Sequence, residues 1–153
     1  MPKFSDTLIN SSIETSLIDI LNLYMCFEKS INITKLKNFS IKLSLWINNF
    51  IPELLKDFHI PKQLDSDIIN PKVLYIGTIK KHEVLFLIFL SKIGCDVLYL
   101  NPQTEGDFSI VDPKCMYSMI INEPIKEPLD IAKLDINKLE EPPILNNSIK
   151  NYK

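Results

Sequence analysis

The spacing of apolar residues changes twice in the middle of this chain. Residues 73–76 are apolar without alternation, which is typical of a strand that is covered on both faces. Residues 83–93 form a longer run, rich in leucine and apolar all round, as in a helix that is covered on several sides. Gly94 supplies a left-handed helix stop, and residues 97–100 form a second strand-like run. This pattern predicts a strand–helix–strand unit with parallel strands.

The first sixty residues carry two apolar stripes with the three- and four-residue spacing of amphipathic helices. The first stripe spans Ser5–Ser30 and contains Leu8, Ile9, Ile13, Leu17, Ile20, Leu21, Tyr24 and Phe27. The second starts near Thr34, a candidate N-cap, and contains Leu36, Phe39, Leu43, Trp46, Ile47 and Phe50. Pro52 allows either a kinked continuation of this helix to Phe58 or a short third helix. We expect both stripes to pack into a core, with a partner-binding surface as the alternative.

Together these patterns predict one α/β domain with four parts. They are an N-terminal helical segment at 1–60, a linker at 61–71, a Rossmann-like core at 72–125 and a Pro-rich, partly disordered tail at 126–153. Tyr117–Ile121 is the candidate third strand, Phe108–Val111 a short extended piece, and Asp130–Leu139 one or two helical turns. Two or three mainly parallel strands make a thin sheet, so a truncated domain is one interpretation.

Composition narrows the classes of partner. The 153 residues carry a net charge of −2, and all 17 basic residues are lysines. We therefore expect no general attraction to nucleic acid, and no guanidinium is present to clamp a phosphate. No apolar run approaches membrane-spanning length, and the N-terminus lacks a signal-peptide pattern, so we expect a cytoplasmic chain without a membrane partner. Three cysteines without a CxxC spacing predict neither a disulfide framework nor a metal site.

Candidate chemistry lies where the two predicted strands end, because ligands of open α/β sheets bind at the carboxyl ends of the strands. The candidate ligand-binding residues are Gly77, Thr78, Lys80, Lys81, His82, Glu83, Asn101 and Asp107. Backbone N–H groups at the start of the helix, together with a lysine, suit a phosphate or carboxylate. One glycine is not a dinucleotide fingerprint, so an ordinary turn and helix cap is the alternative. No motif in the sequence indicates which cofactor, if any, the chain binds.

Several single residues have two interpretations each. His82 suits a general acid or base, although a solvated first-turn histidine is the simpler interpretation. Asp107 and Asp112 suit a sugar hydroxyl or a metal ion, and an ordinary polar loop explains them equally well. Cys95 follows the helix stop, away from the strand ends, and is better read as a buried small hydrophobe than as a nucleophile. No serine or cysteine triad is readable, so the catalytic residues are unknown.

Four stretches together resemble the YceG-like family, described as a component of a biosynthetic module in tellurite-resistance-type stress operons. They are Trp46–Leu55 (WINNFIPELL), Val73–Gly77 (VLYIG), Lys81–Leu100 and Tyr117–Pro124 (YSMIINEP). The most specific parts are the KHE…FL…LSK-G-DVLYLNP run and the Tyr-Ser pair that opens the last stretch. The resemblance implies a Rossmann-like unit in a cytoplasmic bacterial protein, beside enzymes that make or modify a small metabolite. No motif in it is diagnostic of a reaction, so whether the chain is an enzyme stays open.

Two functional hypotheses follow. The leading one is a component of a bacterial stress- and tellurite-resistance-linked biosynthetic system that binds a small anionic or nucleotide-type ligand at the strand ends. The alternative is a non-catalytic, truncated Rossmann-like module that docks a partner protein through a sheet edge or through the N-terminal helices.

Overall fold

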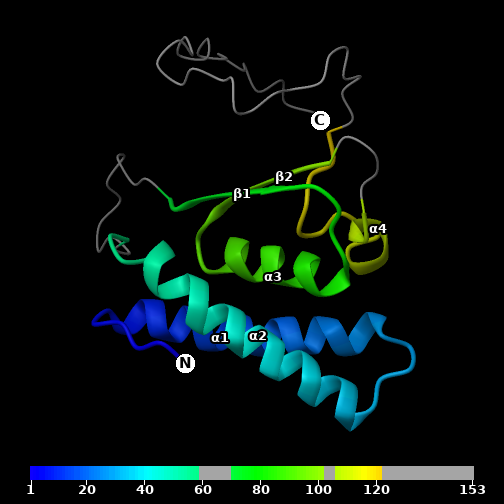
Figure 1. The fold of residues 1–153 in the computed structure, drawn as a ribbon, viewed down its shortest axis with the longest axis horizontal. Coiled ribbons are helices and arrows are strands. Elements are labelled where there is room, and N and C mark those ends of the chain that lie inside the picture. The colour runs from blue at the N-terminus through cyan, green and yellow to red at the C-terminus, as the bar shows by residue number, and fades with distance from the viewer. Residues whose placement is uncertain (59–69, 102–105, 122–153) are drawn as a thin grey trace, which may run out of the picture. The chain divides into compact units, whose positions relative to one another are not determined.

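Two long helices open the chain, and a strand–helix–strand unit follows them (Figure 1). The computed structural model describes residues 1–58, 70–101 and 106–121. Met1–Ile121 forms one compact unit, whereas a second unit, Asn122–Lys153, lies outside the described residues. The elements in chain order are α1 (Thr7–Phe27), α2 (Ile33–Leu54), β1 (Lys72–Ile76), α3 (Lys81–Lys92), β2 (Asp96–Leu100) and α4 (Phe108–Val111).

Side-chain caps decide where the two N-terminal helices begin. The Asp6 carboxylate accepts a hydrogen bond from the Leu8 N–H at 2.8 Å and starts α1. The Asn32 amide oxygen accepts from the Lys35 N–H at 2.9 Å, so α2 starts before the predicted cap at Thr34. Pro52 lies inside the last turn of α2, which runs on to Leu54. The second helix thus continues past Pro52, but it ends four residues before the predicted end at Phe58, and no separate helix begins within residues 50–58.

Most residues of the two N-terminal stripes pack into the core, as predicted, but Leu8 and Phe50, which the prediction included, are exposed at the ends of the stripes. The buried apolar residues of α1 are Ile9, Ile13, Ile20 and Tyr24, and those of α2 are Phe39, Leu43, Ile47 and Ile51. They join one hydrophobic cluster with the residues of α3. Tertiary burial of these stripes stabilises the two helices more than their intrinsic propensity does.

Helix α3 is the centre of the fold and is covered on more than one side, as its sequence predicts. Six of its residues are buried: Val84, Leu85, Leu87, Ile88, Phe89 and Leu90. One side of α3 lies against the sheet, and the other lies against α1 and α2 (Figure 1). Its half-buried Phe86 meets the Trp46 ring of α2 with centroids 5.2 Å apart. At its C-terminal end, Gly94 has φ +98°, which confirms the left-handed stop.

Among the described residues the sheet has two parallel strands, paired from Lys72↔Asp96 to Ile76↔Leu100. Alternate residues point to opposite faces of a strand, and here the two faces differ. Val73, Tyr75, Val97 and Tyr99 are half-buried and pack against the core, whereas Leu74, Ile76 and Leu98 are exposed. The prediction of strands covered on both faces is therefore wrong for the described residues, because α3 covers only one face.

The remaining structural predictions concern the segments that flank the core. Phe108–Val111 is a single helical turn, α4, and not an extended piece, because the Asp112 N–H bonds back to the Phe108 carbonyl oxygen at 2.7 Å. Tyr117–Ile121 is not assigned as a strand and pairs with neither described strand. Most of the predicted linker at 61–71, the tail at 126–153 and the turns at Asp130–Leu139 lie outside the described residues. The helices and the parallel pair agree with an α/β fold, and the Rossmann-like assignment stays a prediction.

Candidate functional site

The carboxyl ends of β1 and β2 lie flush with each other. The Gly77 N–H donates to the Leu100 carbonyl oxygen at 3.0 Å and extends the ladder by one residue. Gly77 then turns the chain with φ +109°, a conformation that side chains other than glycine rarely adopt. A Cβ atom at Gly77 would meet nothing within 4 Å, so the backbone here faces free space. Helix α3 begins at Lys81, four residues after Gly77 and two residues before the predicted start at residue 83.

Two carboxylates of the chain itself occupy backbone donors at the start of α3. Asp107 Oδ2 accepts from the Lys81 N–H at 2.9 Å, and Glu83 Oε2 accepts from the Lys80 N–H at 3.1 Å. These are the groups that a bound phosphate would use, and negative charge is favourable at this end of a helix. The chain therefore caps α3 with its own anions, one of them contributed from 26 residues away.

The two candidate lysines differ in their surroundings. The Lys81 ammonium lies 4.0 Å from Glu28 Oε2 and 6.0 Å from the centre of the Phe27 ring, so it faces the end of α1. Lys80 is exposed at the N-cap of α3. Thr78 is also exposed, and its carbonyl oxygen accepts a hydrogen bond from the Tyr75 hydroxyl at 3.3 Å. Thr78 and Lys80 are thus the candidate side chains that remain near the free space at Gly77.

His82 is packed between the helices and is not the solvated first-turn histidine that its position suggests. Its ring centroid lies 4.7 Å from that of Phe39 and 5.5 Å from that of Tyr24. Burial, followed by the nearby Lys42 ammonium, lowers the pKa of the imidazole below its ordinary value. His82 is therefore mainly neutral near pH 7 and contributes packing at the junction of α1, α2 and α3.

Three candidate polar residues follow β2: Asn101, the helix-capping Asp107, and Asp112, which is buried after α4. Asp112 is only 4% exposed and accepts hydrogen bonds from the Met116 N–H (2.7 Å), the Tyr117 N–H (2.9 Å) and the Ser118 hydroxyl (2.8 Å). Burial raises the pKa of this carboxyl, but the hydrogen bonds outweigh burial and hold it below its ordinary value. The Asn101 side chain donates to the Tyr99 hydroxyl at 2.8 Å. The Asp112 carboxylate thus stabilises the loop that follows it, through residues 116–118.

Comparison with known proteins gives the family. A YceG domain matches residues 1–137. The chain belongs to the YceG family. It is 26% identical over 113 residues to an uncharacterized protein YceG of Bacillus subtilis (strain 168), a match that covers 73% of this chain and 20% of that relative. The chain thus spans about a fifth of the length of that relative. No solved structure matches.

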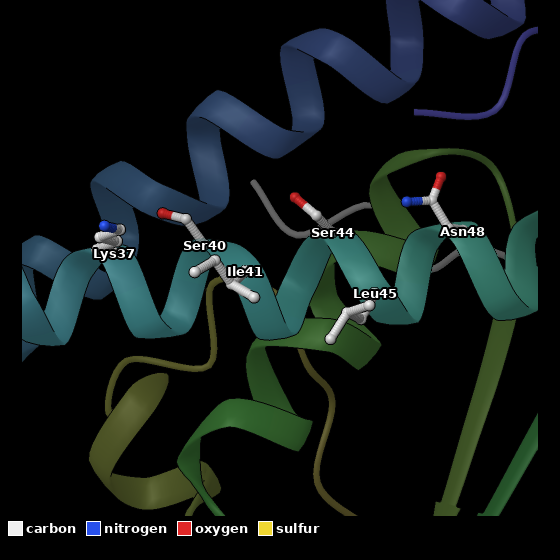
Figure 2. A pocket seen from close by; sticks show the side chains of 6 residues that line it. All are labelled: Lys37, Ser40, Ile41, Ser44, Leu45 and Asn48. Atoms are coloured by element: carbon white, nitrogen blue, oxygen red, sulfur yellow. The ribbon is translucent and has the colours of Figure 1, made fainter.

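Two shallow hollows of this YceG-family chain lie away from the strand ends. One, of about 290 Å³, runs along the exposed side of α2 and is lined by Lys37, Ser40, Ile41, Ser44, Leu45 and Asn48 (Figure 2). The other lies at the N-terminus, between residues 1–3 and the start of α1. Neither hollow includes a residue that the sequence singled out for ligand binding. Within residues 1–58, 70–101 and 106–121, no three His, Cys, Asp or Glu residues gather to hold a metal ion.

The open face of the sheet is the surface that sequence reasoning missed. We use this name for Leu74, Ile76 and Leu98, which are 52%, 52% and 56% exposed on the side of the sheet away from α3. Lys72 and Asp96 form an ion pair at one end of it. Parallel sheets are almost always covered on both faces, so an uncovered apolar face is unusual. The continuous apolar runs predicted the strands correctly but carry no information about which face stays uncovered.

No helix among the described residues combines the length and the apolar character needed to cross a bilayer. The long helices α1 and α2 instead mix exposed polar positions with their buried stripes.

Proposed function

We propose that this chain is a docking module of a YceG-type protein, and that the open face of its sheet receives a covering layer from a partner polypeptide. The observation that carries the proposal is the exposure of Leu74, Ile76 and Leu98 on a parallel strand pair whose opposite face is packed on α3. Clustered apolar side chains that stay exposed on a sheet mark an interaction site. The partner we favour is the remainder of a YceG-type polypeptide, since the chain spans about a fifth of its Bacillus relative.

The test uses the part of Bacillus subtilis YceG outside the matched region, produced as a separate polypeptide and titrated with this chain in a calorimeter. We expect binding that Leu98→Lys weakens, because a leucine buried on docking contributes about 1.5–3 kcal/mol, or roughly 10- to 100-fold in Kd. Leu45→Lys is the matched control: Leu45 is also 56% exposed, but it lies on α2 (Figure 2). Absence of binding, or equal weakening by both variants, would refute docking at the open face.

The α2 hollow is the competing docking surface, and the same pair of variants separates the two. If Leu45→Lys weakens binding and Leu98→Lys does not, the partner docks on the helical side of the molecule. We favour the sheet because an exposed leucine on an amphipathic helix is common, whereas an uncovered face on a parallel strand pair is rare.

A small anionic or nucleotide-type ligand at the strand ends is a second candidate function. The free space over Gly77, with exposed Thr78 and Lys80 beside it, supports this possibility. Asp107 opposes it, because its carboxylate already binds the Lys81 N–H. If an anion binds here, it competes with that carboxylate. Asp107→Asn should then strengthen binding of inorganic phosphate or ADP in a thermal-shift assay, and Lys80→Ala should weaken it. Unchanged melting temperatures with both probes would exclude these two ligands.

The biological setting that the resemblance implies is part of the same proposal. A docking module would act as one component of a bacterial, stress- and tellurite-resistance-linked biosynthetic system, and need not be an enzyme itself. The test is growth of a strain that lacks this chain in the presence of tellurite. Restoration of growth by the wild-type chain but not by Leu98→Lys would connect the setting with the open face.

A further inference from the structure

The residues after Asp112 form an exposed apolar segment that the core does not use. We define the exposed segment as Met116–Ile121, which has no charged residue and no proline. Met119 is 83% and Ile121 68% exposed. No backbone hydrogen bond joins residues 119–121 to any other described residue. Residues 119–121, which have the composition of a strand, thus have no backbone partner among the described residues.

The start of the exposed segment is fixed in place. Asp112 accepts from two backbone N–H groups and from the Ser118 hydroxyl, all within 2.9 Å. The Lys92 ammonium lies 5.7 Å from the centre of the Tyr117 ring and connects the segment with α3. Because these contacts already order the start of the segment, less conformational entropy is lost when the segment binds a partner, and this favours docking.

The same chain also carries sheet edges to which such a strand can be added. Among the described residues, β1 and β2 are each hydrogen-bonded to a strand on one side only, so each has a free outer edge. Natural edge strands are usually protected by charges or proline. Here the strands contain no proline, and their only charged residues, Lys72 and Asp96, stand at the first position and pair with each other.

We propose that two copies of this chain pair reciprocally, the exposed segment of each adding as a strand to an outer sheet edge of the other. Donor and acceptor lie on one chain, so a two-fold arrangement satisfies both and closes on itself. A second copy fits because neither surface bears an unpaired charge that would select a different partner. The pairing uses strand edges and backbone groups, so it is independent of docking at the open face.

The experiment is sedimentation velocity of the full chain over a concentration series from about 5 to 200 µM, a range in which weak, transient interfaces associate. We expect the mass to rise toward that of two chains. Ile120→Pro removes one strand-pairing N–H without touching the Asp112 hydrogen bonds, and should abolish the rise. Ile120→Val keeps the N–H and the strand propensity, and should preserve it. Circular dichroism melts confirm that each variant is folded.

The other outcomes overturn the proposal. A chain that stays monomeric across the series has no reciprocal pairing. A dimer that survives Ile120→Pro but is lost in Leu98→Lys associates through its open face instead. Failure of this proposal leaves docking at the open face untouched, because the Leu98→Lys binding experiment with the Bacillus polypeptide does not depend on self-association.

Discussion

The buried carboxylate of Asp112 offers the sharpest test of how this fold is held together. It accepts three hydrogen bonds, from two backbone N–H groups and one hydroxyl, while only 4% exposed. In Asp112→Asn one carbonyl oxygen remains as an acceptor, and the new NH2 group faces donors. An amide oxygen in the place of Oδ2 keeps the bonds from the Tyr117 N–H and the Ser118 hydroxyl, as bonds to a neutral group, and the bond from the Met116 N–H is lost. A hydrogen bond to a charged group contributes roughly 1.5–3 kcal/mol. We expect the free energy of unfolding to fall by about 3 kcal/mol, an order-of-magnitude value.

The assay is urea unfolding at pH 7, followed by the fluorescence of the single tryptophan, Trp46, with Asp57→Asn as the control. Asp57 is an exposed acid near the end of α2, so its substitution should change stability little. The pH dependence supplies an independent check. The pKa of Asp112 is lower in the folded chain than in the unfolded one. Its contribution is therefore present above the unfolded value of about 3.9 and is lost as pH falls through the folded value.

The wild-type chain should thus lose more stability than Asp112→Asn when the pH is lowered from 7 to 3, and the two unfolding curves should approach each other. A change below about 0.5 kcal/mol at pH 7, or parallel loss on acidification, would refute the reasoning, because such a change is typical of exposed sites. A change of that size would mean that water replaces the hydrogen bonds and that the loop after Asp112 is not held by it.

Three other predictions test the core. Burial lowers the pKa of His82, so the unfolded chain binds more protons below about pH 6.5, and stability should fall as pH drops through that range; His82→Phe should flatten this part of the profile. Burial raises the pKa of Cys95 to about 11, so iodoacetamide should label Cys26 and Cys115 in the folded chain and Cys95 only after denaturation, as mass spectrometry would show. Ile47 is fully buried, so Ile47→Ala should cost about 3 kcal/mol in chemical unfolding, and a cost below 1 kcal/mol would contradict the packing described.

Local periodicity predicted most of the fold, because the helices α1, α2 and α3 bury their apolar residues within the chain itself. The stripes of α1 and α2 and the change of period around α3 depend on neighbouring residues, which the sequence shows directly. The local sequence does not decide where a helix starts. Thr34 and Asn32 are both good capping residues, and the choice depends on which side chain reaches the Lys35 N–H. Phe108–Val111 has strand-forming residues but is one helical turn, because the propensity of only four residues is too weak to determine their secondary structure.

The candidate site was harder to predict, because its character depends on contacts between distant residues. A helix start after a strand and a glycine looks like an anion site, and whether its N–H groups are free cannot be read from the local sequence. Here Asp107 reaches Lys81 across 26 positions, and His82 meets rings from α1 and α2. The Asp107 carboxylate takes the backbone donor that a ligand would otherwise bind, and the two rings replace solvent around His82.

We rank the two proposed functions by what the bound ligand or partner would have to displace from the chain. A phosphate at the start of α3 must compete with the carboxylate of Asp107, which is already hydrogen-bonded to a backbone donor and favourably placed at the end of the helix dipole. A polypeptide layer on the open face displaces only water from Leu74, Ile76 and Leu98, which favours association through the hydrophobic effect. The backbone donors of Lys80 and Lys81 at the start of α3 are already bound by the chain's own carboxylates, while the sheet face is left uncovered. This difference is why we place docking before ligand binding in a chain that spans about a fifth of its relative.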